Sequence, residues 1–276
     1  MEPFVLEEKE FFSLSQWVGM FPDLTVGFTT KNGGKSDHEF DSLNMGFHVN
    51  DTKKNVCENR EILAKKLDFP IQHWVGAEQT HEVQIKTITH SDKGMGANTY
   101  DSAFSRTDGF FTLDKGILLT LCFADCVPLY FLHPQSKTIG IAHAGWKGTV
   151  NGIARDMIQN FQVKEMKASE ILVAIGPSIC ENCYIVDDNV INLVQNRLEG
   201  VEILPYNEIS DGQYRLNLKE CNKQILLLAG VLPENILVTK LCTSCHKDLF
   251  YSHRRDQGKT GRMISFIGWK ETKQKK

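Results

Sequence analysis

Five short segments rich in β-branched and aromatic residues lie close together in the middle of the chain and constrain the fold most. They are 83-VQIKTI-88, 109-GFFTL-113, 117-ILLTLCF-123, 127-VPLYFL-132 and 138-TIGIAH-143. Segments of this length and composition predict β-strands. Further strands are predicted at 171–175, 235–240 and 263–269. Because some strands are consecutive and others alternate with helical patterns, we expect mixed rather than purely parallel sheets.

Apolar residues at helical spacing predict helices between these strands. The predicted helices cover 51–67 with Asp51 as the cap, 149–161, a segment that begins at Asp187 or Asp188, and 217–229. A chain of 276 residues is long enough for one large domain. We therefore expect a single α/β domain over 1–276, with a frayed basic tail at 270–276.

Charge and apolar patterning exclude several classes of partner. The formal net charge of −3 argues against a nucleic-acid or anionic membrane surface as the main partner. The N-terminal MEPFVLEEKEFF lacks the features of a secretory signal, and the apolar run 116–132 is too short and too interrupted to span a membrane. We expect a cytoplasmic protein, in which eight cysteines serve as core residues, ligands or catalytic thiols rather than disulfides.

The last two of the five central segments predict a hairpin around the turn 133-HPQS-136. If the turn is centred between Pro134 and Gln135, Cys126 and His143 face each other directly across the antiparallel pair. Directly opposed residues have Cβ atoms about 4.5–5.5 Å apart, which lets a thiolate and an imidazole share one ion. The hairpin is therefore predicted to bring these two side chains together.

Plain packing explains the surroundings of this pair poorly, because Asp125 and Pro128 open one strand and the turn AGWKG follows the other. Two chemistries fit a cysteine beside a histidine. His143 can activate Cys126 as a nucleophile, or both can bind a metal with a third ligand. His81 in 78-EQTHEVQI-85 is one candidate among nine histidines. Three such ligands leave one tetrahedral position open, as in catalytic zinc sites.

Besides these three residues, several separated sequence motifs together span nearly the whole chain. They are FTTKNGG at 28–34, SLNMGFHV at 42–49, ENR at 58–60, QTH at 79–81, ADCVP at 124–128, HAGWKG at 143–148, GPSIC followed by CY at 176–184, and YSHRRDQGKTGR at 251–262. In this order they resemble the YfiH-like family of purine nucleoside phosphorylases, formerly labelled multicopper polyphenol oxidases or laccase-domain proteins.

The resemblance implies a zinc ion bound by His81, Cys126 and His143, which would be the catalytic residues. It also implies phosphorolysis of adenosine, inosine, guanosine and S-methyl-5′-thioadenosine with phosphate as co-substrate, and deamination of adenosine. The implied fold is a compact α/β domain with stacked mixed sheets and outer helices. We expect purine nucleosides and phosphate as the partners of a monomeric enzyme.

Phosphorolysis requires cationic groups that hold phosphate and stabilise developing charge. The candidates are Lys31, Lys147, Arg254 and Arg255, and Asn44 is a candidate contact to the nucleoside. Lys31 and Lys147 stand where many relatives have arginine, so bidentate contacts to an anion are lost at both positions.

Two CxxC pairs, Cys180/Cys183 and Cys242/Cys245, could together form a structural zinc site. Neither second cysteine precedes the glycine that often completes such a turn, and the metal site implied by the resemblance does not use them. We therefore expect buried thiols at these positions.

The former label as laccases implies that the protein binds several copper ions, and the histidine pattern tests this. A multicopper oxidase typically binds its coppers with paired His-x-His segments, and the nine histidines form no such segment. Copper can still occupy a site with these ligands in vitro. The alternatives to purine chemistry are therefore a copper-dependent polyphenol oxidase and a metal-free Cys–His hydrolase.

Overall fold

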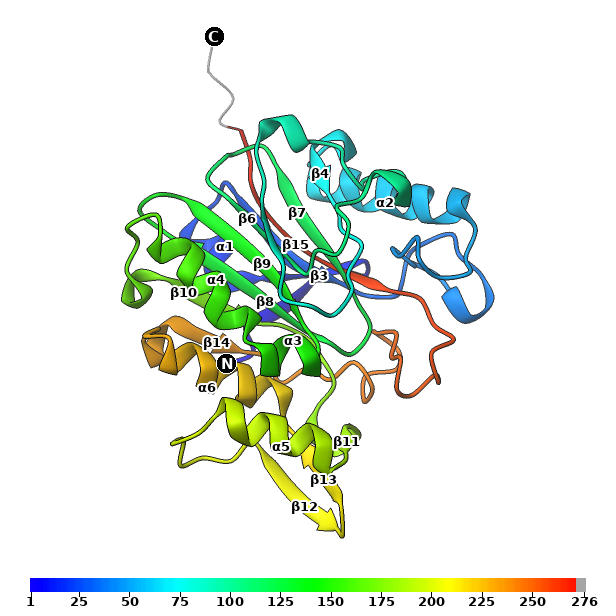
Figure 1. Ribbon diagram of the computed structural model, residues 1–276. Helices are drawn as coiled ribbons and strands as arrows, with labels where there is room; N and C mark the ends of the chain where they lie inside the picture. The colour runs from blue at the N-terminus through cyan, green and yellow to red at the C-terminus, as the bar shows by residue number, and fades with distance from the viewer. Residues whose placement is uncertain (272–276) are drawn as a thin grey trace.

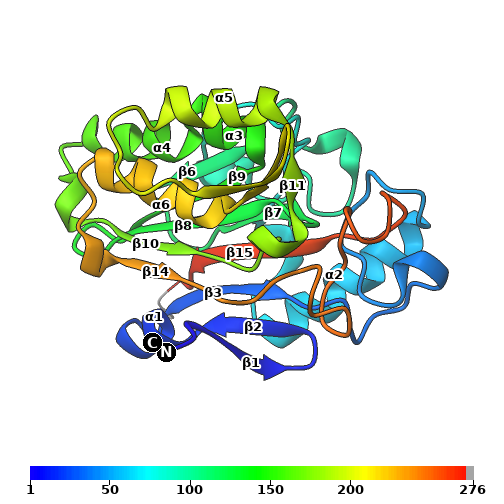
Figure 2. The ribbon, with the colours of Figure 1, turned by 90° about the horizontal axis from the view of Figure 1, so that it is seen from below.

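Two stacked six-stranded sheets form the centre of the computed structural model, which describes residues 1–271 (Figures 1 and 2). The first sheet has the order β1 (Phe4–Glu8), β2 (Phe11–Leu14), β3 (Leu24–Thr29), β15 (Met263–Trp269), β7 (Leu118–Phe123), β4 (Trp74–Val75). The second has the order β14 (Ile236–Val238), β10 (Leu172–Ile175), β8 (Val127–His133), β9 (Thr138–Ala144), β6 (Gly109–Thr112), β5 (Ile85–Thr87). A three-stranded sheet contains β11 (Ile185–Val186), β13 (Gln213–Leu216) and β12 (Tyr206–Ser210).

Helices cover the outside of the stacked sheets. Figure 2 shows four of them over the second sheet: α3 (Trp146–Asn151), α4 (Ile153–Gln162), α5 (Asp188–Arg197) and α6 (Leu218–Leu228). The long helix α2 (Lys53–Leu67) packs on the first sheet, where Leu63 contributes to a cluster with Leu118 and Phe266. A short helix α1 (Ser15–Met20) links β2 to β3. The predicted α/β class with stacked mixed sheets and outer helices is confirmed.

The strands β8 and β9 lie at the centre of the second sheet and are buried on both faces. Leu129 and Phe131 point into the core under the helices, whereas Tyr130 and Leu132 point into the layer between the sheets. A strand buried on both sides needs apolar residues at every position, which explains the uninterrupted hydrophobic segments of the sequence. β8, β9 and β6 pair antiparallel, whereas β10 pairs parallel with β14.

The register of the β8–β9 hairpin differs from the prediction. His143 pairs with Pro128, not with Cys126, and Gln135 lies inside a four-residue connection between His133 and Thr138. The predicted turn was therefore two residues too short. A shift of two residues leaves every side chain on its predicted face of the sheet, so Cys126 and His143 still share one face, diagonally rather than directly opposed.

The predicted helix 149–161 is wrong in one respect, because the structure divides it into α3 and α4. Gly152 separates the two helices with φ of 93°, a left-handed conformation that glycine adopts without strain. The predicted cap of α2 is also displaced by one residue. Thr52 accepts a hydrogen bond from Asn55 N at 3.2 Å, whereas Asp51 binds Ser36 and Asn44.

The tail predicted at 270–276 begins with ordered contacts. Lys270 N donates a hydrogen bond to Asp23 O at 2.9 Å, and Glu271 forms an ion pair with Lys93 at 2.8 Å. The rest of that tail, 272–276, lies outside the described residues. No helix within residues 1–271 is both long and apolar enough to cross a lipid bilayer.

Candidate metal centre

Three side chains from separate parts of the second sheet converge at one end of the layer between the sheets. Cys126 immediately precedes β8, His143 lies in β9, and His81 lies on the turn before β5. One ligand atom of each lies within 4.8 Å of those of the other two. His81 reaches this position with φ of 63°, in the left-handed region. We call these three residues the donor group.

Asp108, which lies directly before β6, fixes two members of the donor group from behind. Its Oδ1 accepts a hydrogen bond from His143 Nδ1 at 2.8 Å and another from His81 N at 3.1 Å. Its Oδ2 accepts from the backbone N–H groups of Thr80 and Glu82. With Nδ1–H engaged by the carboxylate, Nε2 is the ring nitrogen of His143 that would bind a metal ion in place of a proton, as in carboxylate–histidine–zinc sites.

The electrostatics of the donor group favour a thiolate. Burial alone would raise the pKa of Cys126, but the imidazoles of His143 and His81 outweigh it and lower that pKa to about 6. Burial alone would lower the pKa of His143, whereas Cys126 and Asp108 raise it to about 9. Asp108 keeps a lowered pKa despite its burial, because His143 and backbone N–H groups donate to it. A half-buried thiolate beside two imidazoles is a donor set that suits zinc.

Gly145, the residue after β9, leaves the space that the donor group needs. A Cβ atom at this position would lie 3.0 Å from Cys126 Sγ and 3.2 Å from His81 Cδ2. The backbone of Gly145 has φ of −66°, so any residue could adopt its conformation. The glycine is therefore required by the closeness of the ligands and not by the backbone.

Replacing Gly145 with alanine should lower the affinity of the donor group for zinc at least about tenfold, because the added methyl group displaces Cys126 and His81 from their common centre. Equilibrium competition with a chromophoric chelator would measure this. Gly19→Ala is the matched control, since a Cβ there meets no atom within 4 Å. Equal zinc affinity in the two variants would contradict this role of Gly145.

The donor group opens into a pocket of about 410 Å³, a volume typical of small-molecule sites. Part of the wall is apolar or aromatic and consists of Trp146, Ile179, Tyr184 and Leu218. The polar part includes His48, Gln79, His253, Arg254 and Arg262. The pKa of His48 is lowered to about 4 by desolvation and by the charges of Arg262 and Arg60, which keeps this imidazole neutral near pH 7.

Arg254 is the one proposed substrate-binding residue that lines this pocket among the described residues. Its guanidinium lies 4.8 Å from the centre of the Tyr184 ring and donates to Ile185 O at 3.0 Å. Lys147 is exposed, with its ammonium 5.6 Å from the Trp146 ring, and Lys31 lies half-buried outside the pocket lining.

Two other candidates hold loops in place. Asn44 is fully buried and donates to Asp51, while its Oδ1 accepts from Gly46 N and from Arg262 N. It thereby holds the backbone of Arg262, whose side chain lines the pocket. The guanidinium of Arg255 donates to the carbonyl groups of Thr243, Ser244 and Phe250 and pairs with Asp256.

Asp125 lines the pocket wall but directs its carboxylate to the C-terminal loops. It accepts hydrogen bonds from Thr243, Ser252 and Arg254 N at 2.6, 3.0 and 2.7 Å. The carboxylate therefore anchors the backbone of Arg254 beside the donor group.

Sequence reasoning did not single out Asp108, Tyr184, His48 or Arg262. Asp108 stands in 107-TDG-109 at the start of a predicted strand, which is a signal for an acidic residue at a sheet end. The other three lie inside the motifs CY, SLNMGFHV and KTGR, where residue type alone does not show which side chain faces the pocket.

The prediction of buried thiols at the two CxxC pairs is wrong. Cys180 and Cys183 are half-buried, Cys245 is exposed, and Cys242 alone of the four is buried. All four sulfur atoms lie within 4.8 Å of one another. The pairs are 59 or more residues apart in sequence, so their meeting depends on the parallel pairing of β10 with β14, which both loops follow.

Comparison with known proteins identifies relatives over nearly the full chain. The family model described as "Multi-copper polyphenol oxidoreductase laccase" matches residues 25–270. A Geobacillus stearothermophilus protein named purine nucleoside phosphorylase YlmD is 49% identical over 252 residues, which covers 91% of this chain and 92% of that protein. A Bacillus subtilis protein of the same name is 48% identical over 250 residues and 90% of each chain.

Solved structures agree with the sequence matches. The crystal structure of YlmD from G. stearothermophilus has a TM-score of 0.95 to this chain, at 46% identity, and covers 98% of this chain and 100% of that one. The structure of a Bacillus licheniformis protein named YfiH has a TM-score of 0.93 at 45% identity, with the same coverage.

Proposed function

The chain belongs to the multi-copper polyphenol oxidoreductase laccase family, and we propose that it is a zinc-dependent purine nucleoside phosphorylase. The observation that carries the proposal is the donor group at the base of a pocket with an aromatic wall and two arginines. A purine needs a flat apolar surface, and phosphate needs cationic donors, so one pocket provides for both substrates. The relatives named purine nucleoside phosphorylase support this assignment.

In the proposed complex, the purine packs against Tyr184 and Trp146, and phosphate binds near Arg254 and Arg262. An oxygen of hydrogenphosphate forms a bond to C1′ of the ribose while the bond from C1′ to the purine nitrogen breaks. The proton of hydrogenphosphate ends on the departing purine, so charge and atoms balance. The arginines stabilise negative charge on the phosphate and orient it toward C1′.

His81, Cys126 and His143 would hold the zinc ion, and the close approach that Gly145 permits supports this fit. When bound, zinc supplies Lewis acidity that polarises an oxygen atom and lowers the pKa of a water molecule. Asp108 keeps His143 in the tautomer and orientation that binding needs. The neutral imidazole of His48 is available at the pocket wall to hydrogen-bond a ribose hydroxyl.

We propose adenosine, inosine, guanosine and S-methyl-5′-thioadenosine as substrates, because the purine ring and ribose are common to all four. Hydrolysis of the adenosine amino group to give inosine and ammonia is proposed as a second activity at the same site. That reaction needs an activated water near C6 of the purine, which a zinc site with an open position supports.

A metal-free Cys–His hydrolase is the second candidate, and the chain Cys126–His143–Asp108 favours it. The low pKa of the thiol and the carboxylate behind the imidazole are features of an activated cysteine nucleophile. His81 favours the zinc site over this hydrolase, because a nucleophile activated by His143 does not need a second imidazole beside its sulfur. A copper oxidase has less support, since the two metal-suited groups in residues 1–271 contain only two histidines.

The function is tested by incubating metal-analysed protein with adenosine, with and without phosphate, and separating the products by chromatography. We expect adenine and ribose 1-phosphate only with phosphate, and inosine under both conditions. Complete removal of metal by a chelator should end both reactions, and added zinc should restore them. Activity that survives metal removal but is lost on thiol alkylation would instead establish the hydrolase.

We propose that the enzyme acts in the cytoplasm as a monomer. None of the eight cysteines in the described residues forms a disulfide, as expected in a reducing compartment. The donor group and the pocket wall come from one chain, so a second copy is not needed to complete the site.

A further inference from the structure

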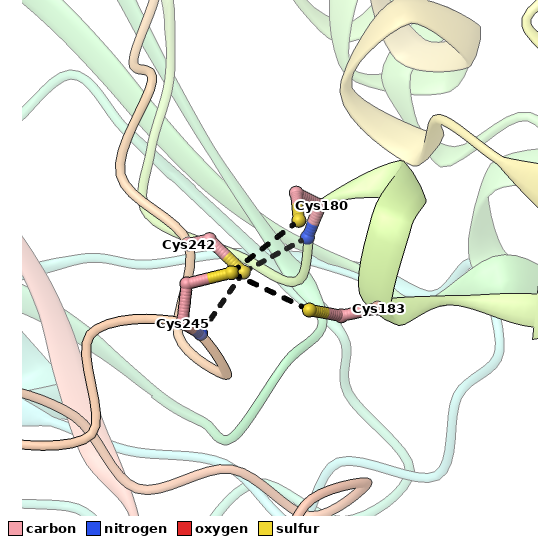
Figure 3. A group of neighbouring side chains, drawn as sticks. All are labelled: Cys180, Cys183, Cys242 and Cys245. Atoms are coloured by element: carbon pink, nitrogen blue, oxygen red, sulfur yellow. Dashed lines mark hydrogen bonds between the residues drawn. The ribbon is translucent and has the colours of Figure 1, made fainter.

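We infer that Cys180, Cys183, Cys242 and Cys245 bind a second zinc ion, which has a structural role. These four residues form the four-cysteine group, which is separate from the donor group. Figure 3 shows the four side chains pointing toward a common centre from two different loops. Cys180 and Cys183 lie in the loop after β10, and Cys242 and Cys245 lie in the loop after β14.

The distances among the sulfur atoms fit a tetrahedral zinc ion. A Zn–S bond of about 2.3 Å requires sulfur atoms about 3.8 Å apart at the corners of a tetrahedron. Cys180 Sγ lies 3.8 Å and Cys183 Sγ lies 3.4 Å from Cys245 Sγ, and all four lie within 4.8 Å. A disulfide would join Cys245 to one partner only and would leave the approach of the others unexplained.

Backbone and side-chain donors around the group suit thiolates. The N–H groups of Cys180 and Cys245 donate to Cys242 Sγ at 3.2 and 3.4 Å. The buried ammonium of Lys219 donates to the carbonyl groups of Thr239 and Leu241, next to Cys242. Four thiolates around one divalent cation carry net negative charge, which these donors offset. Four sulfur ligands without carboxylate or water select zinc or iron, and we assign zinc.

The group connects two loops that shape the pocket. Ile179 and Tyr184, which line the pocket, flank the Cys180–Cys183 pair. On the other loop, Thr243 donates to Asp125, and the Thr243 carbonyl accepts from Arg255. Because sulfur fills all four coordination positions, the ion cannot bind substrate and instead holds the aromatic wall against the loop that carries Arg254.

Metal analysis of Cys126→Ala tests the inference without disturbing the four-cysteine group. Wild-type protein should contain two zinc ions per chain, and Cys126→Ala should retain one. Cobalt(II) added to metal-free Cys126→Ala should give the intense thiolate charge-transfer and visible bands of a tetrahedral four-sulfur site. Absence of zinc from this variant, or iron in its place, would overturn the assignment, as would a disulfide found within the group by native thiol labelling.

The double variant Cys183→Ser/Cys245→Ser provides the converse measurement. It should lose one zinc per chain, whereas Cys57→Ser, a thiol outside both groups, should lose none. Wild-type zinc content in the double variant would contradict the inference. If that variant does not fold, Cys126→Ala alone decides. Metal content does not depend on nucleoside turnover. If the proposed phosphorolysis failed, the zinc content would therefore still decide whether the four-cysteine group binds zinc.

Discussion

Cys126→Ala should reduce phosphorolysis of adenosine about a thousandfold or more. The substitution removes the thiolate from the donor group and leaves two imidazoles, which hold zinc far more weakly. Lewis acid stabilisation of a transition state contributes several kcal/mol, and each 1.36 kcal/mol changes a rate tenfold. The measurement is the rate of adenine formation with saturating phosphate, together with the zinc content of the same preparation.

Cys57→Ala is the matched control, because Cys57 is also a half-buried free thiol but lies on α2, outside the pocket lining. It should keep both wild-type turnover and wild-type zinc content. Unchanged phosphorolysis in Cys126→Ala would remove the donor group from the mechanism. Loss of activity with full zinc content at the donor group would indicate that the thiol acts as a nucleophile.

Asp108→Asn should lower zinc affinity or turnover about 10- to 100-fold and also destabilise the fold. The amide nitrogen of asparagine would face backbone N–H groups or His143 Nδ1–H, so at least one donor loses its acceptor. Hydrogen bonds to charged groups contribute about 1.5–3 kcal/mol each, and we expect a loss of about 3 kcal/mol in the free energy of unfolding. Urea denaturation of metal-free protein measures the loss of stability, and zinc competition measures the loss of affinity.

Asp114→Asn is the control for this substitution. The half-buried carboxylate of Asp114 accepts a hydrogen bond from His90 N at 3.0 Å, and an asparagine oxygen can accept the same bond. Stability and zinc affinity should therefore stay near wild type. If Asp108→Asn behaved in the same way, the carboxylate would not be what orients His143.

The convergence of Cys126 and His143 could be predicted although the predicted register was wrong. The turn residue Pro134 placed the connection correctly, but not its length, because a four-residue turn closed by Lys137 with φ of 56° is not evident from the sequence. The error was an even number of residues. Since side chains alternate between the two faces of a strand, the two ligands stayed on one face.

Contacts between distant segments were the part that the sequence did not reveal. Asp108 acts on His143 through the pairing of β6 with β9. Its place at the start of a predicted strand marks an acidic residue at a sheet end but does not show which side chain it meets. The residues that flank the two CxxC pairs do not show that the pairs meet, because their meeting depends on how β10 and β14 pair. The strands β1 and β12 also escaped prediction, because half or more of their residues are exposed and charged or polar side chains interrupt their apolar pattern.

Some of the functional residues of the pocket belong to buried strands, and others belong to loops. In the donor group, His143 lies in β9, Cys126 directly precedes β8, and Asp108 holds the backbone of His81, whereas His48, Tyr184 and Arg254 come from loops. Loops accept substitution and changes of length more readily than buried strands. Directed evolution confined to these loops should therefore alter the preference among the proposed nucleosides, while the donor group keeps its affinity for zinc.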